Sequence, residues 1–193
     1  MRAQAHALEG VMASLIILLG LFFALQAVTV TPLTASLAQQ HVADQGQAAA
    51  TGTLTAAQET GDLRPTLLYW NESRATFHGA TGRGFYVAGG PPTALGGMLN
   101  ETFNPRRLVF NVNLVYLDSA GNRQRRPLVR SGEPPADVVV ATRTVTLYDH
   151  DRLRDASGEP TNTHLENGSY FAPDVGSGEV YNVVEIEVVI WQG

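Results

Sequence analysis

The chain has 193 residues, 44% of them hydrophobic, and a formal net charge of −5 at pH 7. This length suits one core-forming domain with an appendage, and the acidic balance argues against nucleic acid as a partner, because that affinity comes mainly from clustered cations. The lack of cysteine excludes disulfides and thiolate chemistry, and all 13 basic residues are Arg, which excludes chemistry that needs a lysine amine.

An apolar segment follows the first ten residues. From Val11 to Val30 only Ser14, Gln26 and Thr29 are polar, and a helix of this length rises about 30 Å, the thickness of a bilayer core. We therefore predict a transmembrane helix over residues 11–31 that contacts membrane lipid. A removable secretory signal peptide and a buried helix of a soluble domain are the alternatives.

The residues around this segment predict its orientation. Arg2 and the initiator amine precede it, which favours a cytoplasmic leader of residues 1–10. The expected localisation is the cell membrane, with a single pass and an extracellular C-terminal domain.

The leader itself has a recognisable order of residues, Arg2-Ala3-Gln4-Ala5-His6-Ala7-Leu8-Glu9-Gly10. A short basic leader, a glutamate and then a hydrophobic helix resemble the class III signal sequence of archaeal type IV pilins and pilin-like proteins, over residues 1–30. The resemblance implies a prepilin peptidase that cuts after Ala3 or Gln4, so that the mature chain begins at Gln4 or Ala5. It also implies that Glu9 pairs with the N-terminal amine of a neighbouring subunit during assembly. A plain signal anchor, in which Glu9 meets the positive end of the helix dipole, is the alternative.

The next stretch, residues 32–61, begins at Pro32 and is rich in Ala and Gln, with apolar residues at loosely helical spacing. We predict a second helical segment that serves as a connector, with a semi-ordered stalk as the alternative.

Beyond Pro65 the apolar residues recur with a period of two. This pattern predicts long strands at residues 107–117, 137–148 and 179–191, and short strands at 66–70, 75–78 and 84–88. The alternation is one-sided, so we expect an antiparallel sheet with one buried face and one solvated face.

The predicted fold class is α+β: an N-terminal transmembrane helix that continues into a second helical segment, followed by an antiparallel β-sheet domain over residues 62–193. The pilin resemblance implies the same pilin-like arrangement, with the far half of the helix on the sheet. A β-sandwich on a helical stalk is the alternative.

Several motifs are candidate sites. Three sequons, at Asn71, Asn100 and Asn167, lie between predicted strands and are candidates for glycosylation, with ordinary turns as the alternative. Asp149 and Asp151 are weak candidates for binding a hard cation, and a solvated turn is the alternative.

Two further segments are rich in one residue type. The glycine-rich stretch from residue 79 to 97 completes no dinucleotide fingerprint, so we interpret it as a flexible surface loop. The local basic patch of Arg123, Arg125, Arg126 and Arg130 at a hairpin end could contact anionic lipid, a glycan or an acidic subunit; a solvated loop is the alternative.

No nucleophile elbow or triad spacing is present, so the sequence indicates no enzyme, no catalytic residue and no cofactor. The favoured function is a cell-surface structural protein, a pilin-like subunit or minor component of a type IV pilus-type filament or its assembly apparatus. Its expected partners are lipid, a prepilin peptidase and other pilin-like subunits, in a homo- or hetero-oligomer. The alternative is an anchored extracellular binding or adhesion module.

Overall fold

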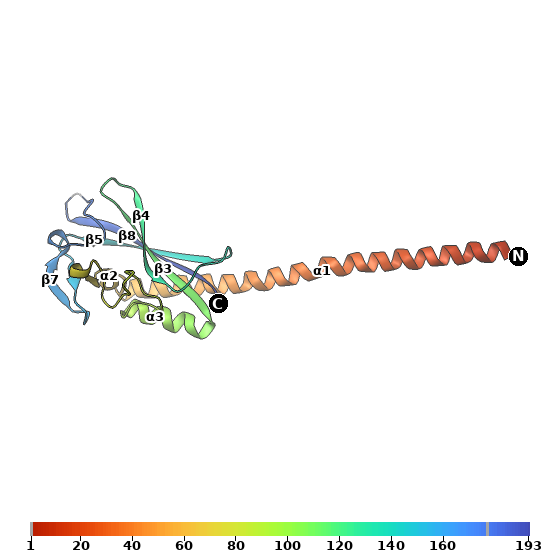
Figure 1. Cartoon of the computed structure of the whole chain (residues 1–193), viewed down its shortest axis with the longest axis horizontal. Coiled ribbons are helices and arrows are strands. Elements are labelled where there is room, and N and C mark those ends of the chain that lie inside the picture. The colour runs from red at the N-terminus through yellow and green to blue at the C-terminus, as the bar shows by residue number, and fades with distance from the viewer. Residues whose placement is uncertain (1, 177) are drawn as a thin grey trace. The chain divides into compact units, whose positions relative to one another are not determined.

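The computed structural model describes the backbone of residues 2–176 and 178–193, and the side-chain surroundings of residues 9–24, 43–176 and 178–193. The chain groups into two compact units, Met1–Val42 and Ala43–Gly193. Helix α1 (Arg2–Glu59) contributes residues to both units, and the other described elements belong to the second (Figure 1).

Helix α1 is a single element of 58 residues. We predicted two helical parts that meet at Pro32, because proline lacks the N–H that would bond one turn back. In the structure the two parts form one helix, and Pro32 does not end it. The C-terminal end of α1 belongs to the core of the second unit, since Ala50, Leu54 and Ala57 are completely buried.

The prediction of a transmembrane helix is wrong. Within the described part of the chain, no helix is both long enough and apolar enough to cross a membrane. A bilayer core is roughly 30 Å thick, so a spanning helix needs about 20 consecutive apolar residues, and no helix among the described residues meets that requirement. The predicted single-pass localisation, with a cytoplasmic N-terminus and an extracellular domain, is not supported either.

The second unit is built on a four-stranded antiparallel sheet. Its strands are β3 (Leu108–Leu117), β4 (Arg123–Arg130), β5 (Val139–Tyr148) and β8 (Val180–Gln192), in the spatial order β4-β3-β8-β5 (Figure 1). The three long strands expected from the period of two are therefore confirmed as β3, β5 and β8.

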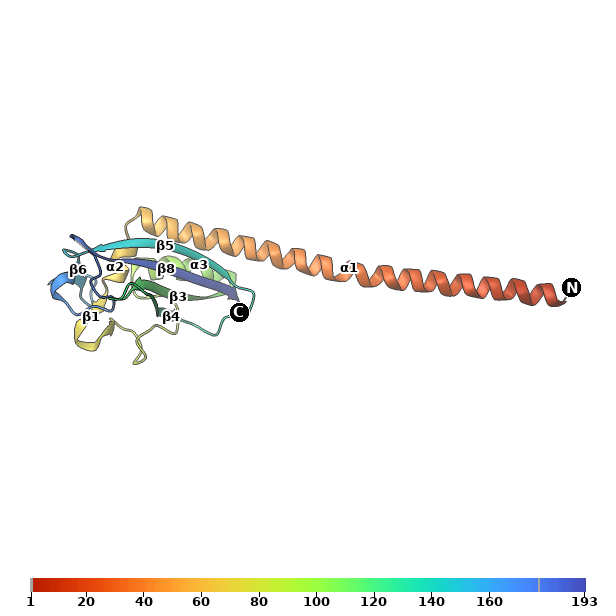
Figure 2. The ribbon, with the colours of Figure 1, turned by 90° about the horizontal axis from the view of Figure 1, so that it is seen from above.

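One face of this sheet is buried and the other is polar, as the alternation predicts. The buried face includes Phe110, Val112 and Leu114 of β3, and Val184 and Ile186 of β8. These side chains pack in one core with residues of α1, α2 (Leu63–Leu67) and α3 (Ala94–Phe103), and Figure 2 shows the sheet from above. The sheet packs on helices, so the fold is α+β and the β-sandwich alternative is wrong.

The short predicted strands fared less well than the long ones. Residues 66–70 include the last two residues of α2 and only the first residue of β1 (Trp70–Asn71), which pairs with β2 (Thr76–Phe77). The segment 84–88 makes a single bridge, between Tyr86 and Val129 of β4. The strand predicted at 75–78 is present as β2. Brief apolar runs fit a strand and a buried helical turn equally well, which is why the predictions at 66–70 and 84–88 failed.

The glycine-rich stretch is ordered by contacts that the sequence did not reveal. Its last residues begin α3, and the Thr93 hydroxyl caps this helix by accepting from the Gly96 N–H. A Cβ at Gly96 would lie 1.8 Å from the carbonyl oxygen of Pro91, so glycine at this position permits two backbones to touch. The interpretation as a flexible loop is therefore wrong for this end of the stretch.

A further two-stranded antiparallel pair and short 3₁₀ helices make up the other described elements of the second unit. Strand β6 (Arg152–Arg154) pairs with β7 (Pro160–His164). The short helices are Glu72–Arg74, Asn104–Arg106 and Leu165–Asn167.

Candidate assembly site on the N-terminal helix

The most unusual surface of the described residues is the stretch of α1 between residues 11 and 23, which we call the apolar segment. Its large apolar side chains are each between 51% and 70% exposed: Val11, Met12, Leu15, Ile16, Ile17, Leu18, Leu19, Leu21, Phe22 and Phe23. By contrast, the exposed large apolar side chains described in the second unit are three valines, at 87, 140 and 183.

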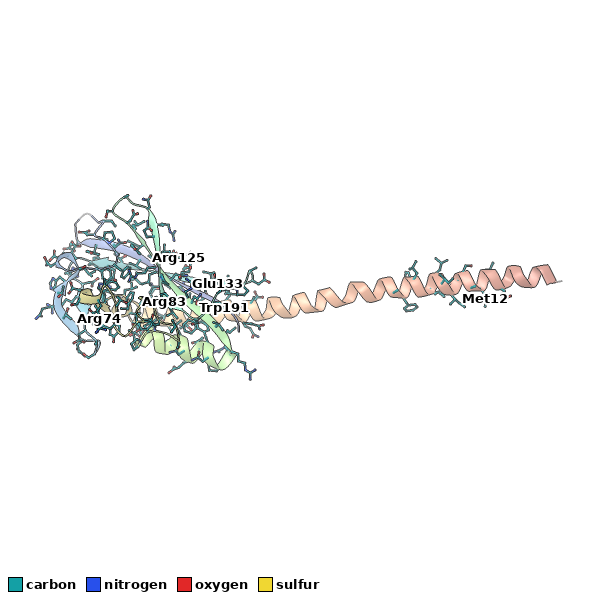
Figure 3. All side chains as sticks on the ribbon, viewed as in Figure 1. Met12, Arg74, Arg83, Arg125, Glu133 and Trp191 are labelled. Carbon is teal, nitrogen blue, oxygen red and sulfur yellow. The ribbon has the colours of Figure 1, made fainter. Side chains whose placement is uncertain are left out.

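The apolar segment has no polar side. Consecutive helical residues are about 100° apart, so the four residues from Ile16 to Leu19 alone surround the helix axis. The hydroxyl of Ser14 donates to the carbonyls of Gly10 and Val11 of its own helix, both at 2.9 Å. Figure 3 shows the side chain of Met12 extending from this part of α1. A helix that is apolar all round is stable only when it is surrounded.

The driving force for covering this segment is large. Fully burying one large apolar side chain contributes about 1.5–3 kcal/mol, and these ten are between 51% and 70% exposed, so covering them gives roughly 9–18 kcal/mol in total. Association itself costs about 4–15 kcal/mol. At the middle of both ranges, covering the apolar segment by other apolar surfaces is therefore favourable even after that cost.

Small residues lie along one side of the same segment. Ala13, Gly20 and Ala24 are spaced by seven and four residues, which places them in one row along the helix. A Cβ at Gly20 would have nothing within 4 Å, so this side is open. Small side chains allow the backbone of a neighbouring helix to approach closely.

The predicted processing and assembly residues lie just before the apolar segment. Glu9 is exposed and belongs to the same helix, three positions before Met12. Ala3, Gln4 and Ala5 are also helical, but their side chains lie outside the described residues. Cleavage after Ala3 or Gln4 stays a prediction.

The two aspartates considered for a cation have different roles. Asp151 is buried and structural: it accepts from the Tyr148 N–H at 2.8 Å and lies 3.6 Å from an Arg64 nitrogen. One oxygen of Asp149 is buried without a hydrogen-bond partner among the described residues. Burial, followed by the charge of Asp174, raises the pKa of Asp149 above its ordinary value. Among the described residues no group of acidic or histidine side chains could hold a metal ion.

The three sequons differ in their surroundings. The Asn71 side chain caps the first short 3₁₀ helix by accepting from the backbone N–H three residues later. Asn100 is part of α3, where its carbonyl oxygen accepts from the Gly90 N–H at 2.9 Å. Asn167 is exposed, and its amide donates only to the neighbouring Glu166 at 3.1 Å. Glycosylation takes place on the amide nitrogen, and of the three side chains only Asn167 is exposed, so it is the most accessible of the three.

The predicted basic patch does not exist as a set of free charges. Arg123 pairs with Glu185 at 2.9 Å and Arg125 with Glu187 at 2.8 Å, across the solvated face of the sheet. Arg130 pairs with the nearby Glu133 at 2.9 Å, and Figure 3 labels Arg125 and Glu133. The arginines belong to β4, which pairs with β3 across a short turn, so the expected hairpin is present.

Arg126 points to the opposite face of β4, as the alternation of a strand requires. Its guanidinium lies over the ring of Trp70, 4.8 Å from the centroid, and donates to the carbonyl of Ala75 at 3.2 Å. Burial lowers the pKa of Arg126. The alternation of Glu185 and Glu187 is visible in the sequence, but these residues are opposite Asn113 and Val115 of β3, and the arginines of β4 reach them across β3. Only the order of the strands reveals these ion pairs.

Comparisons with known proteins give one match. The model of a family of unknown function, DUF7288, matches residues 2–190. No curated protein and no solved structure matches the chain.

Proposed function

The chain belongs to the DUF7288 family, and we propose that it is a structural subunit, pilin-like in organisation, which assembles with other subunits through the apolar segment of α1. The assembly would be a type IV pilus-type filament or part of the apparatus that builds one. The single observation that carries the proposal is the exposure of ten large apolar side chains around one described stretch of helix.

The form of the apolar segment favours a bundle over a pair of helices. Two packed helices cover only the facing stripe of each, which would leave most of the apolar surface in water. A helix with neighbours on all sides is covered completely. An assembly of several copies therefore accounts for the whole segment, including the row of small residues at Ala13, Gly20 and Ala24.

The position of Glu9 supports the same reading. A carboxylate beside an apolar helix bundle is unfavourable unless it finds a positive partner, so it penalises packing in the wrong register. The resemblance to type IV pilins supplies that partner as the N-terminal amine of a neighbouring subunit. Removal of the leader after Ala3 or Gln4 would place this amine close to Glu9 along the helix.

Sedimentation and electron microscopy of the full chain test the proposal. We expect the wild type to form large assemblies, and Ile17→Asp to prevent them, because Ile17 is 70% exposed in the single chain and would be buried in a bundle. Val87→Asp is the matched control: Val87 is 49% exposed but lies in the second unit, so this variant should assemble normally.

Two results would overturn the proposal. One is a wild type that stays monomeric at high concentration, and the other is a wild type that partitions into lipid vesicles as a monomer. N-terminal mass spectrometry of the native protein tests the processing step separately, since an intact Met1 or Arg2 would show that the leader is retained.

A further inference from the structure

Strand β5 is one edge of the four-stranded sheet, and much of it is unprotected. Exposed edge strands are normally guarded by charged side chains or proline, because they can pair with another chain. The sequence of β5 contains no proline, and its one charged residue, Arg143, donates to the hydroxyl of Thr55 on α1 and to the carbonyl of Thr142, so it leaves the N–H groups of the edge uncovered. The side chains of Val140, Thr142 and Thr144 are exposed.

The hydrogen bonds of the opposite edge determine which way the backbone groups of β5 point. At β4, the Tyr86 N–H donates to the carbonyl of Leu128 and the Arg130 N–H donates to the carbonyl of Tyr86, so both β4 residues point away from the sheet. Successive residues of a strand point to opposite neighbours, so Val129 bonds toward β3, where it is paired with Val112.

The same alternation extends across the sheet to β5. The backbone groups of Val112 face β4, so those of the odd-numbered residues of β3 face β8. Asn113 is paired with Glu187, so the backbone groups of Glu187 face β3. Those of the even-numbered residues of β8 then face β5. Ile186 faces β5 and is paired with Arg143, so Arg143 and the other odd-numbered residues of β5 form their backbone hydrogen bonds with β8. The N–H and C=O groups of the even-numbered residues of β5 therefore point out of the sheet.

One end of this edge is guarded. Arg64 donates to the outward carbonyl of Thr146 at 3.2 Å, and the outward N–H of Tyr148 donates to Asp151 at 2.8 Å. These two bonds agree with the direction derived from the opposite edge. The ladder is also irregular between Leu147 and Tyr148.

The rest of the edge is open. Among the described residues, the N–H groups of Val140, Thr142 and Thr144 have no hydrogen-bond partner. Three outward N–H groups in a row, on β-branched residues, form a template for another strand.

We propose that this open edge pairs antiparallel with the same edge of a second copy of the chain, about a two-fold axis through Thr142. Each Thr142 then faces Thr142 of the second copy, and Val140 faces Thr144. The N–H of each open residue then donates to a carbonyl of the second copy. The Thr142 carbonyl already accepts from Arg143 at 2.9 Å and would accept the new bond with its second lone pair. Because the two copies are related by a two-fold axis, the interface is isologous. This contact is separate from the apolar segment and rests on different residues.

Other symmetric registers fit less well. A centre at Arg143 would place two arginines opposite each other, which is unfavourable for like charges. A centre at Thr144 would need the N–H of Tyr148, which already donates its one hydrogen to Asp151 at 2.8 Å.

Charge complementarity also supports a second copy in this register. With the centre at Thr142, Asp137 of the second copy lies opposite Leu147, next to the residue whose carbonyl Arg64 binds. Asp137 is exposed and Arg64 is half-exposed, so the two opposite charges can approach at each end of the paired strands.

A charge exchange at the two-fold axis tests the register. Thr142→Lys and Thr142→Asp each place two like charges directly opposite, so each variant alone should lose the pairing, and their mixture should recover it. The measurement is amide hydrogen exchange of Val140, Thr142 and Thr144 in the full chain at low and high protein concentration. In the wild type and in the mixture, we expect these amides to exchange at least about tenfold more slowly at high concentration.

Further variants control for folding and for the helix. Thr142→Val keeps the N–H and the branched side chain and should behave as the wild type. Thr142→Pro removes only an outward N–H, so it should abolish the pairing with little change in thermal stability. Ile17→Asp should leave the concentration-dependent protection of β5 in place, because the edge does not depend on the apolar segment.

The proposal is overturned if the wild-type amides show no concentration dependence, or if the mixture of charged variants recovers nothing. Loss of protection in Ile17→Asp would also overturn it, since the edges would then meet only as a result of assembly through α1. If Ile17→Asp prevents assembly while the amides of β5 stay protected, both proposals are supported independently.

Discussion

Two neighbouring glycines of α3 make a sharp test of the fold. A Cβ at Gly96 would lie 1.8 Å from the carbonyl oxygen of Pro91, so a side chain there must push two backbones apart. A Cβ at Gly97 would have nothing within 4 Å. Substitution by alanine should therefore have opposite effects at adjacent positions of the same helix.

The magnitudes follow from these two environments. Gly97→Ala gains about 0.8–1 kcal/mol of helix propensity, which raises Tm by about 2–4 °C in a domain of this size. Gly96→Ala overpacks the contact with Pro91, at the upper end of the about 1–3 kcal/mol that extra methyl groups cost in packed sites, and lowers Tm by about 6–12 °C. The free energies of unfolding of the two variants should thus lie on either side of the wild-type value.

Thermal unfolding followed by tryptophan fluorescence measures both changes in the full chain, since Trp70, one of its two tryptophans, is only 3% exposed. All three proteins must be compared at one concentration, because assembly shifts apparent stability. If both variants melt at the wild-type temperature, or both shift in the same direction, then α3 does not pack on the preceding loop and the glycine-rich stretch is the flexible loop that its sequence first indicated.

Three more predictions concern stability. Asp149→Asn should raise the free energy of unfolding at neutral pH, and this gain should shrink as the pH falls toward 3.8. The reason is that a raised pKa of Asp149 in the folded state lowers stability only at a pH where the carboxyl of the unfolded chain is ionised. A gain that does not change with pH would contradict this prediction. Asn100→Ala should cost about 1–2 kcal/mol through the lost bond to a backbone N–H, whereas Asn167→Ala should change stability by less than about 0.5 kcal/mol, both measured by urea unfolding. Leu54→Ala should cost about 3–5 kcal/mol in the same assay, since Leu54 is completely buried, and a small cost would show that the end of α1 is not part of the core.

The long strands could be predicted because their pattern has a simple physical origin. On β8, Val184, Ile186 and Val188 alternate with Glu185 and Glu187. Only a strand with one buried face puts the apolar side chains in the core and the carboxylates on the solvated face. The pattern extends over enough residues to exclude a helix. The same alternation also contained the ion pairs with the arginines of β4, but recognising them required the order of the strands.

Helix α3 could not be predicted with the same rules. Two glycines near its start lower its helix propensity, which favours a loop. The helix forms because Leu95, Leu99 and Phe103 recur at every fourth position and are all completely buried. That spacing was visible in the sequence, but the close contact between Gly96 and Pro91, which explains the glycines, exists only in the folded chain.

The N-terminal helix shows a different limit. The apolar sequence of residues 11–30 indicates that this surface is more stable when it is buried away from water. The hydrophobic effect has no direction, so the sequence does not specify whether lipid or protein covers that surface. We read the segment as membrane-spanning, and the described residues do not support a spanning helix. Assembly of several copies uses the same driving force without requiring a span of bilayer length.

The two surfaces proposed for assembly would contribute different properties. The apolar segment supplies most of the free energy, but apolar side chains permit many rotations and shifts of one helix along another. The open edge of β5 supplies only a few hydrogen bonds, yet a shift of one residue there would turn Thr142 and its neighbours away from their partners. Strength from α1 and register from β5 would together define one arrangement of neighbouring copies, and a charge at Ile17 should remove the first without the second.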